Sequence, residues 1–152
     1  MKSTVGICAT LLVMGGLSSC GPSPRSESGS PPDGQGIEDE LWRTGRDAAG
    51  QFVDTLPFMD DGSVRLWGQG RYGMLCAPCH DARGTGRGPQ FERTAIHAGN
   101  FHDPRLRAAP DGQIFDTITH GRGLMVGLKH SIPVEDRWAI VAYVRQLQEE
   151  GP

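Results

Sequence analysis

The stretch Cys76-Ala77-Pro78-Cys79-His80 is the part of this chain whose residue order specifies a covalent chemistry. A C-x-x-C-H run is the attachment signature of a c-type haem, in which two cysteine thiols add across the vinyl groups of the porphyrin. The adjoining histidine then lies directly beneath the iron. The run therefore predicts one covalently bound haem c, held by Cys76 and Cys79, with His80 as the proximal ligand of the iron.

Two other uses of a C-x-x-C pair fit the chain less well. A zinc site would need two further ligands in a second cluster. Beyond residue 20, however, the chain has no other cysteine pair and no histidine pair flanked by ligand spacing. A thioredoxin-like redox pair would follow a strand in a βαβ pattern, which this sequence does not show. Haem attachment remains the favoured interpretation.

The amino terminus has the pattern of an exported lipoprotein. Residues 1–19 combine a short positive start with an apolar run that is too short to span a bilayer by itself. They end in Leu17-Ser18-Ser19-Cys20, which resembles the bacterial lipobox, so Cys20 is predicted to be acylated and to anchor the protein. The alternative is an ordinary secretory cleavage that leaves Cys20 as a free thiol. In both cases we expect the protein to leave the cytoplasm.

Two further segments precede the haem motif. Residues 20–36 are rich in Gly, Pro and Ser and predict a disordered tether, with a reach of about 50 Å when extended. Residues 37–62 regain apolar side chains without sustained periodicity. This irregular extension either wraps over the following domain or lies along a partner protein, and the sequence leaves both possibilities open.

The charges are unevenly distributed along the chain. Residues 20–62 carry 3 basic and 9 acidic side chains, whereas residues 63–152 carry 11 basic and 9 acidic ones. A domain with so little net positive charge lacks the basic footprint that nucleic-acid binding needs. We therefore expect no nucleic-acid partner.

Residues 63–150 are predicted to form one all-α domain that closes around its haem. A helix over residues 63–75, with Ser63 as N-cap, leads into the haem motif. Pro133 and two acidic residues begin the last helix, which is expected to run to about Glu149. Gly68, Gly70 and Gly73 in the first helix predict close approach by the last one, with an aromatic residue over Gly68.

Between these two helices, Asp111 is predicted to cap a short helix that reaches Thr119, and Gly121 to end it. No strand pattern stands out in this part of the sequence.

A second protein ligand would make the haem an electron carrier, whereas an open iron would suggest catalysis or gas sensing. Met125 lies in the flexible segment Gly121-Arg122-Gly123-Leu124-Met125, which follows one predicted helix and precedes another. Such a loop can place its methionine over the far face of the haem, so Met125 is the favoured second ligand. The other candidates are His97, His102, His120 and His130.

Several segments resemble class I cytochromes c, among them the haem motif and residues 136–148. Over residues 57–148 the chain is similar to the monohaem cytochrome c lipoprotein subunit of bacterial alternative complex III. The closest likeness lies in the run Phe101-His102-Asp103-Pro104-Arg105-Leu106-Arg107 together with residues 136–148. The resemblance implies Met125 as axial ligand. Proline usually follows that methionine, but here Val126 does, which keeps His130 as a substitute. The resemblance also implies a proline carbonyl that orients the proximal histidine, and Pro89 is the best match.

The expected function is single-electron transfer, without catalysis of its own, at the periplasmic face of the bacterial inner membrane. The resemblance implies membrane respiratory complex subunits as partners and a soluble cytochrome or terminal oxidase as acceptor. The alternatives are a free lipid-tethered shuttle, the cytochrome subunit of a periplasmic dehydrogenase and, from another class, a haem enzyme or sensor with an open iron. Basic residues of the loops around the haem are candidates for orienting an acidic partner: Arg83, Arg87, Arg122 and Lys129.

Overall fold

The structure is a computed structural model that describes residue 34, residues 37–90, residue 94 and residues 98–152. The predicted signal peptide, Cys20 and nearly all of the predicted tether lie outside these residues. Six helices and one hairpin follow in order: α1 (Asp39–Thr44), α2 (Ser63–Leu75), α3 (Ala77–His80), α4 (Pro104–Arg107), α5 (Asp111–His120), β1 (Gly121–Arg122), β2 (Met125–Val126) and α6 (Val134–Glu150). The predicted all-α class is confirmed, and the hairpin is a small addition that the sequence pattern did not indicate.

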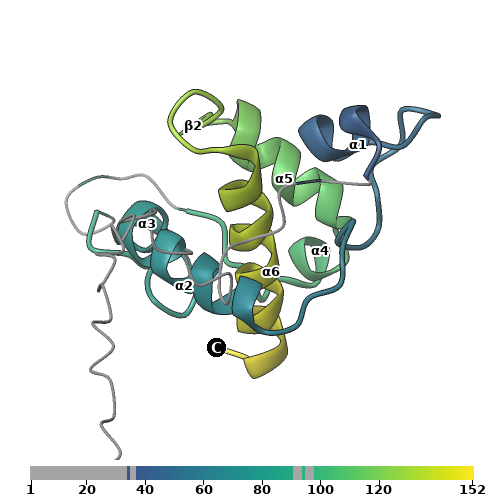
Figure 1. The fold of residues 1–152 in the computed structure, drawn as a ribbon. Helices are drawn as coiled ribbons and strands as arrows, with labels where there is room; N and C mark the ends of the chain where they lie inside the picture. Colours follow the sequence, from purple (N-terminus) through teal and green to yellow (C-terminus); the bar gives the residue numbers. More distant parts are fainter. Residues whose placement is uncertain (1–33, 35–36, 91–93, 95–97) are drawn as a thin grey trace, which may run out of the picture.

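Helices α2 and α6 cross at Gly68 and form the most extensive helix contact in the described part of the chain (Figure 1). A methyl group at Gly68 would overlap the Ala139 carbonyl, with its carbon only 2.6 Å away, and would lie 3.1 Å from Tyr143 Cβ. This confirms the predicted close approach at Gly68 and the aromatic residue beside it. Gly70 and Gly73 face open space instead, so the prediction was wrong for these two glycines.

Two predicted caps are also corrected. The N-cap of α2 is Gly62, and Ser63 is the first helical residue, with its backbone N–H bound to Asp61. The N-cap of α5 is Pro110, so Asp111 is the first helical residue. The Asp111 carboxylate is buried and pairs with Arg145 of α6. It does not cap the helix, because a buried charge is stable only beside an opposite charge.

The core lies between α5 and α6 and is closed by the extension. Trp138 is fully buried and stacks on Phe115 of α5, with ring centroids 4.2 Å apart. On its other side Trp138 stacks on Trp42 of α1 at 6.1 Å and donates its indole N–H to the Trp42 carbonyl at 2.8 Å. Trp42 is itself only 7 % exposed. The extension therefore wraps over the domain at Trp42, which is the first of the two possibilities that the sequence left open.

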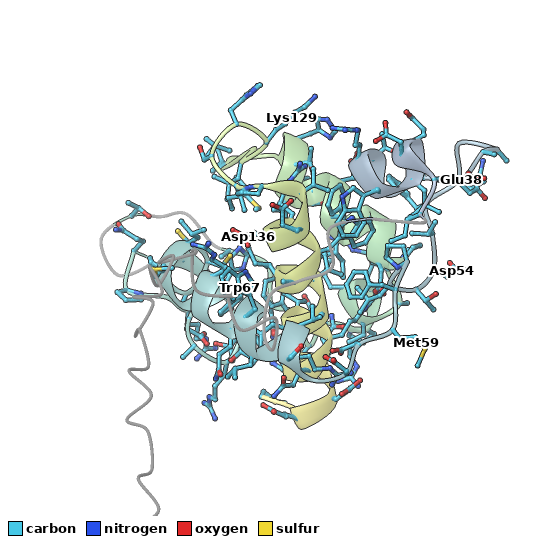
Figure 2. The ribbon with its side chains drawn as sticks, in the orientation of Figure 1. Glu38, Asp54, Met59, Trp67, Lys129 and Asp136 are labelled. Carbon is cyan, nitrogen blue, oxygen red and sulfur yellow. The ribbon has the colours of Figure 1, made fainter. Side chains whose placement is uncertain are left out.

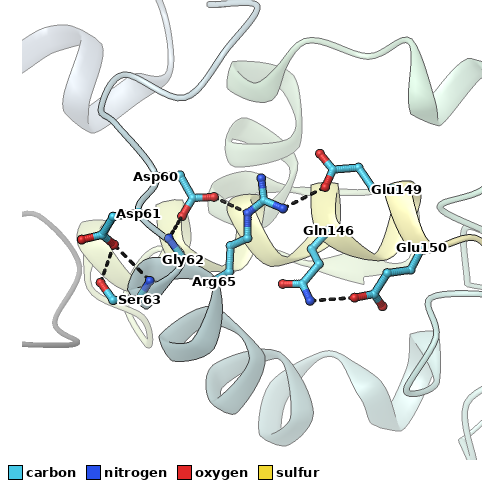
Figure 3. Close-up of polar contacts among 8 residues, drawn as sticks. All are labelled: Asp60, Asp61, Gly62, Ser63, Arg65, Gln146, Glu149 and Glu150. Atoms are coloured by element: carbon cyan, nitrogen blue, oxygen red, sulfur yellow. Dashed lines mark hydrogen bonds and ion pairs between the residues drawn. The ribbon is translucent and has the colours of Figure 1, made fainter.

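Arg65 forms ion pairs at the junction of the extension and α2 (Figure 3). Its guanidinium binds the Asp60 carboxylate just before the helix and the Glu149 carboxylate near the end of α6, the latter at 2.8 Å. Because Glu149 is exposed, that second pair adds little stability. None of the helices in the described ranges is long and apolar enough to cross a membrane.

Candidate haem site

The C-x-x-C-H segment forms one helical turn that continues from α2. The backbone N–H of Cys76 binds the Tyr72 carbonyl at 2.8 Å, and the N–H of His80 binds the Cys76 carbonyl at 2.8 Å. Cys76, Cys79 and His80 thus stand at positions i, i+3 and i+4, which lie on one face of a helix. The local backbone alone therefore directs both thiols and the imidazole to the same side.

The Cys76 thiol has the character of a buried, unreactive group. It is 9 % exposed, and burial followed by the neighbouring Cys79 raises its pKa to about 12. A thioredoxin-like pair or a zinc site needs a thiolate, which is favoured by a lowered pKa. A thioether carries no ionisable proton and so suffers no such penalty on burial. In the described residues no cluster of three or more metal-ligating side chains is found either. The environment of Cys76 thus favours thioether attachment.

The His80 ring is held by a backbone carbonyl and an aromatic ring. Nδ1 lies 3.1 Å from the Gly99 carbonyl oxygen, and the ring stacks on Phe101 with centroids 4.6 Å apart and planes 20° apart. Burial lowers the pKa of His80, although the Gly99 carbonyl and Asp81 oppose this shift. The imidazole is therefore neutral near pH 7, and a bond from Nδ1–H to Gly99 leaves the Nε2 lone pair available for a metal.

The carbonyl that contacts His80 belongs to Gly99, whereas the resemblance implied Pro89. The neighbours of Pro89 bind the haem motif in another way: Gly88 N–H donates to the Cys79 carbonyl at 3.0 Å, and Gln90 N–H donates to the Pro78 carbonyl at 2.9 Å. A methyl group at Gly88 would overlap this backbone. Residues 88–90 therefore brace the C-x-x-C turn rather than the ring of its histidine.

Asp81 anchors the loop that follows His80. It has a φ of 58° and a ψ of 174°, a conformation that is costly for any residue other than glycine. Its carboxylate accepts hydrogen bonds from the Thr85 hydroxyl and from the backbone N–H groups of Arg83 and Arg87. Burial raises the pKa of Asp81, but these hydrogen bonds outweigh it, so that the pKa lies below its ordinary value. Its backbone carbonyl accepts the Tyr72 hydroxyl at 2.7 Å, which ties the loop to α2.

Met125 lies on the short hairpin, where Arg122 pairs with Met125 and Gly121 with Val126. Its side chain is half-buried, whereas the flanking Leu124 and Val126 are 76 % and 74 % exposed. Of these three adjacent apolar side chains, the methionine is the one that turns inward. In Figure 1 this hairpin and α3 lie on the same side of α6.

The alternative histidine ligands are in less suitable places. His120 and His130 are exposed, and His120 contacts Asp116 at 3.1 Å. His102 Nε2 lies 2.8 Å from the Arg83 carbonyl, so the hydrogen-bonded loop already holds that ring. His97 lies outside the described residues. Met125 therefore stays the predicted second ligand.

A buried carboxylate between α2 and α6 was missed at the sequence level. Asp136 of α6 is 4 % exposed, accepts the Trp67 indole N–H at 2.6 Å and pairs with Arg71 at 3.0 Å. Figure 2 shows Trp67 and Asp136 together where α2 and α6 meet. The four-residue spacing of Trp67 and Arg71, which puts them on one helix face, was the signal that could have found it.

These residues fit a c-type haem. Cys76 and Cys79 would hold it through thioethers, His80 Nε2 would bind the iron, and Met125 would approach from the hairpin. When bound, the haem supplies an iron that alternates between the ferric and ferrous states. The chain itself keeps the imidazole neutral, orients it through Gly99 and Phe101, and excludes water from Cys76.

Comparisons with known proteins agree with this fit. A family model described as cytochrome c oxidase, cbb3-type, subunit III matches residues 67–144. No curated protein matches the sequence. Among solved structures, the KustC0563 c-type cytochrome is 27 % identical over 53 % of this chain and 96 % of that chain, with a TM-score of 0.44.

Two further solved structures are less similar in sequence. A chain of the Kuenenia stuttgartiensis reducing HAO-like protein complex is 20 % identical over 71 % of this chain and 54 % of that chain, with a TM-score of 0.52. Cytochrome CL from Methylophaga aminisulfidivorans is 18 % identical over 70 % of this chain and 64 % of that chain, with a TM-score of 0.45. This chain spans about half of the length of the HAO-like complex chain and under two thirds of the length of cytochrome CL. The family match and the helical structure confirm the predicted class I cytochrome c fold.

Proposed function

We propose that this chain carries single electrons in a quinol-oxidising respiratory complex. The chain belongs to the family of the cbb3-type cytochrome c oxidase subunit III and is an electron-transfer cytochrome. The complex is of the alternative complex III kind, at the periplasmic face of the bacterial inner membrane. The chain holds one haem c through Cys76 and Cys79, with His80 and Met125 as axial ligands. Cys20 carries the lipid anchor, and a soluble cytochrome or a terminal oxidase receives the electron.

The observation that carries the electron-transfer role is the geometry at His80. A neutral imidazole whose Nδ1 faces a carbonyl and whose ring stacks on Phe101 is a fixed metal ligand, which one-electron exchange needs. Methionine as the second ligand raises the reduction potential relative to two imidazoles, which suits the high-potential end of a respiratory chain.

The proposed membership of a complex rests on the resemblance that two segments carry. Residues 101–107 and 136–148 lie far apart in the sequence, yet Gln148 donates to the Phe101 carbonyl at 2.9 Å and Arg145 donates to the Arg107 carbonyl at 3.1 Å. The two segments therefore act as one structural unit. Arg83, Arg87, Arg122 and Lys129 are exposed and available to orient an acidic partner.

The absorption spectrum of the oxidised protein tests the ligand set. We expect a sulfur-to-iron charge-transfer band that disappears in Met125→Ala and persists in His130→Ala. A high-spin spectrum in the native protein would contradict the two-ligand assignment and favour an enzyme or sensor with an open iron.

Purification from membranes tests the proposed complex. After mild detergent extraction of the tagged full-length protein, we expect large membrane subunits of a quinol-oxidising complex to co-purify, as identified by mass spectrometry. A monomer without such subunits would instead support a free lipid-tethered shuttle, and co-purification of a soluble substrate-oxidising subunit would support the cytochrome of a periplasmic dehydrogenase.

A further inference from the structure

Gln148 is a buried amide near the end of α6 whose role the haem motif does not explain. It is 5 % exposed, and its Nε2 donates to the Phe101 carbonyl at 2.9 Å and to the Leu106 carbonyl at 3.3 Å. Its Oε1 accepts the Arg145 guanidinium at 2.7 Å, which fixes which end of the amide faces the two carbonyls. A buried amide with every polar atom engaged holds its partners in one arrangement.

Arg145 connects Gln148 to α4 and α5 by further hydrogen bonds. Its guanidinium also binds the buried Asp111 carboxylate and the Arg107 and Ala109 carbonyls. One end of the hydrogen-bonded group is thus fastened to the rigid helices α5 and α6, because both Asp111 and Gln148 are buried there. Because Gln148 donates to the Phe101 carbonyl, Phe101 is held against these helices.

Phe101 connects Gln148 with the proximal histidine. Its carbonyl is held by Gln148, and its N–H donates to the Gly84 carbonyl at 2.8 Å in the loop after the haem motif. Its ring stacks on His80 and meets Tyr72 edge to face at 6.2 Å. Gly84 has no room for a side chain, since a methyl group there would lie 2.6 Å from the Phe101 ring.

The Gly99 carbonyl that faces His80 Nδ1 is two residues before Phe101 and belongs to the same segment. A carbonyl that accepts Nδ1–H makes the imidazole more basic, and a more basic ligand stabilises the ferric over the ferrous iron. The position of residues 99–101 therefore affects the reduction potential.

We propose that Gln148 is a positioning residue for His80, acting through the Phe101 carbonyl to hold the 99–101 segment and thereby set the basicity and ring orientation of the iron ligand. This inference rests on the proposed role of His80. It assigns part of the control of the potential to the last helix, outside the haem motif and its loop.

The test compares Gln148→Met with Gln146→Met in the full-length haem protein. Both changes remove an amide from α6 at similar length, but the Gln146 amide donates to the exposed Glu150 at 2.7 Å instead of to the 101–106 backbone. In Gln148→Met we expect the reduction equilibrium to shift toward the ferrous form by about threefold or more, because the hydrogen bond from Nδ1 to Gly99 weakens. The haem methyl proton shifts in the NMR spectrum, which report the orientation of the His80 ring, should change as well. Gln146→Met should change neither.

A lower melting temperature with unchanged potential and unchanged haem methyl shifts would overturn the proposal and leave Gln148 a merely structural residue. If Gln148→Met does not accumulate, Gln148→Asn keeps a donor one methylene short and should give a smaller shift in the same direction. Failure of the proposed function is seen separately: the wild-type protein would then carry no covalent haem, or His80→Ala would leave its low-spin spectrum unchanged.

Discussion

The two sides of the haem site are built differently. On the proximal side, His80 is held by Gly99 and Phe101, and the Asp81 carboxylate gathers three donors from the following loop. On the distal side, Met125 lies on a hairpin of two-residue strands between two largely exposed neighbours. The predicted proximal ligand is therefore positioned by the folded chain itself. The predicted distal ligand lies on a segment with fewer constraints.

The largest expected effect that separates the two sides is that of Gly88→Ala. The new methyl group would overlap the Pro78 carbonyl and lie 2.6 Å from the Cys79 carbonyl carbon, and backbone atoms yield less readily than the end of a flexible side chain. We expect the free energy of unfolding to fall by about 3 kcal/mol or more, as measured by urea denaturation.

Gly70→Ala is the matched control for this change. Gly70 lies inside α2 with open space where a methyl group would be added, so alanine should increase stability by about 1 kcal/mol. Equal losses in the two variants would show that the backbone around Gly88 is not rigid.

Asp81→Asn is the next largest change on the proximal side. The variant keeps an acceptor but loses the charge, and we expect a loss of about 2 kcal/mol at neutral pH. The folded pKa of Asp81 is lowered from 3.8, so its stabilisation is complete above that pH and is lost as the pH falls toward the folded pKa. The gap between wild type and variant should thus narrow below about pH 4. Urea unfolding of both proteins at pH 7 and near pH 3 measures this difference in stability. A difference that does not change with pH would show that the charge of Asp81 is not its cause.

Tyr72→Phe removes one hydrogen bond from the same loop. Tyr72 is 1 % exposed, and burial raises the pKa of its phenol, which therefore remains a donor to the Asp81 carbonyl. The buried carbonyl would lose its partner, at a cost of about 1 kcal/mol in thermal or urea unfolding. Tyr143→Phe is the control, because within the residues that the structure describes its hydroxyl has no hydrogen bond. A loss as large in the control would assign the effect to packing.

The features that the sequence could predict are mostly local ones. Helix α2 was predicted with its bounds, although not with its cap. Helix α6 was predicted to within one residue, because Pro133 and two acidic residues mark its start locally. The closeness of α2 and α6 at Gly68 followed from a glycine that a helix otherwise disfavours. Cys76, Cys79 and His80 share a face through their spacing alone. Apart from the crossing at Gly68, these features depend on neighbours within a few residues.

The parts that were missed depend on tertiary contacts. Gly99 reaches His80 only because residues 98–101 fold back onto the loop after the haem motif, and no local pattern specifies that return. Asp111 is an ordinary helix cap in the sequence, but burial pairs it with Arg145 instead. Gly73 is as helix-disfavouring as Gly68 yet faces solvent, since only the crossing point of two helices excludes a side chain.

The smallest expected effect is that of Gly123→Ala at the tip of the distal hairpin. Gly123 has a φ of 62° and nothing within 4 Å of an added methyl group, so the change introduces backbone strain without a clash. The left-handed conformation costs alanine about 1 kcal/mol, part of which is offset because the unfolded chain also loses freedom. We therefore expect a loss below about 1 kcal/mol in urea unfolding, with the charge-transfer band of Met125 retained. A loss comparable to that of Gly88→Ala would mean that the hairpin is as constrained as the proximal loop, and the contrast between the two sides would be wrong.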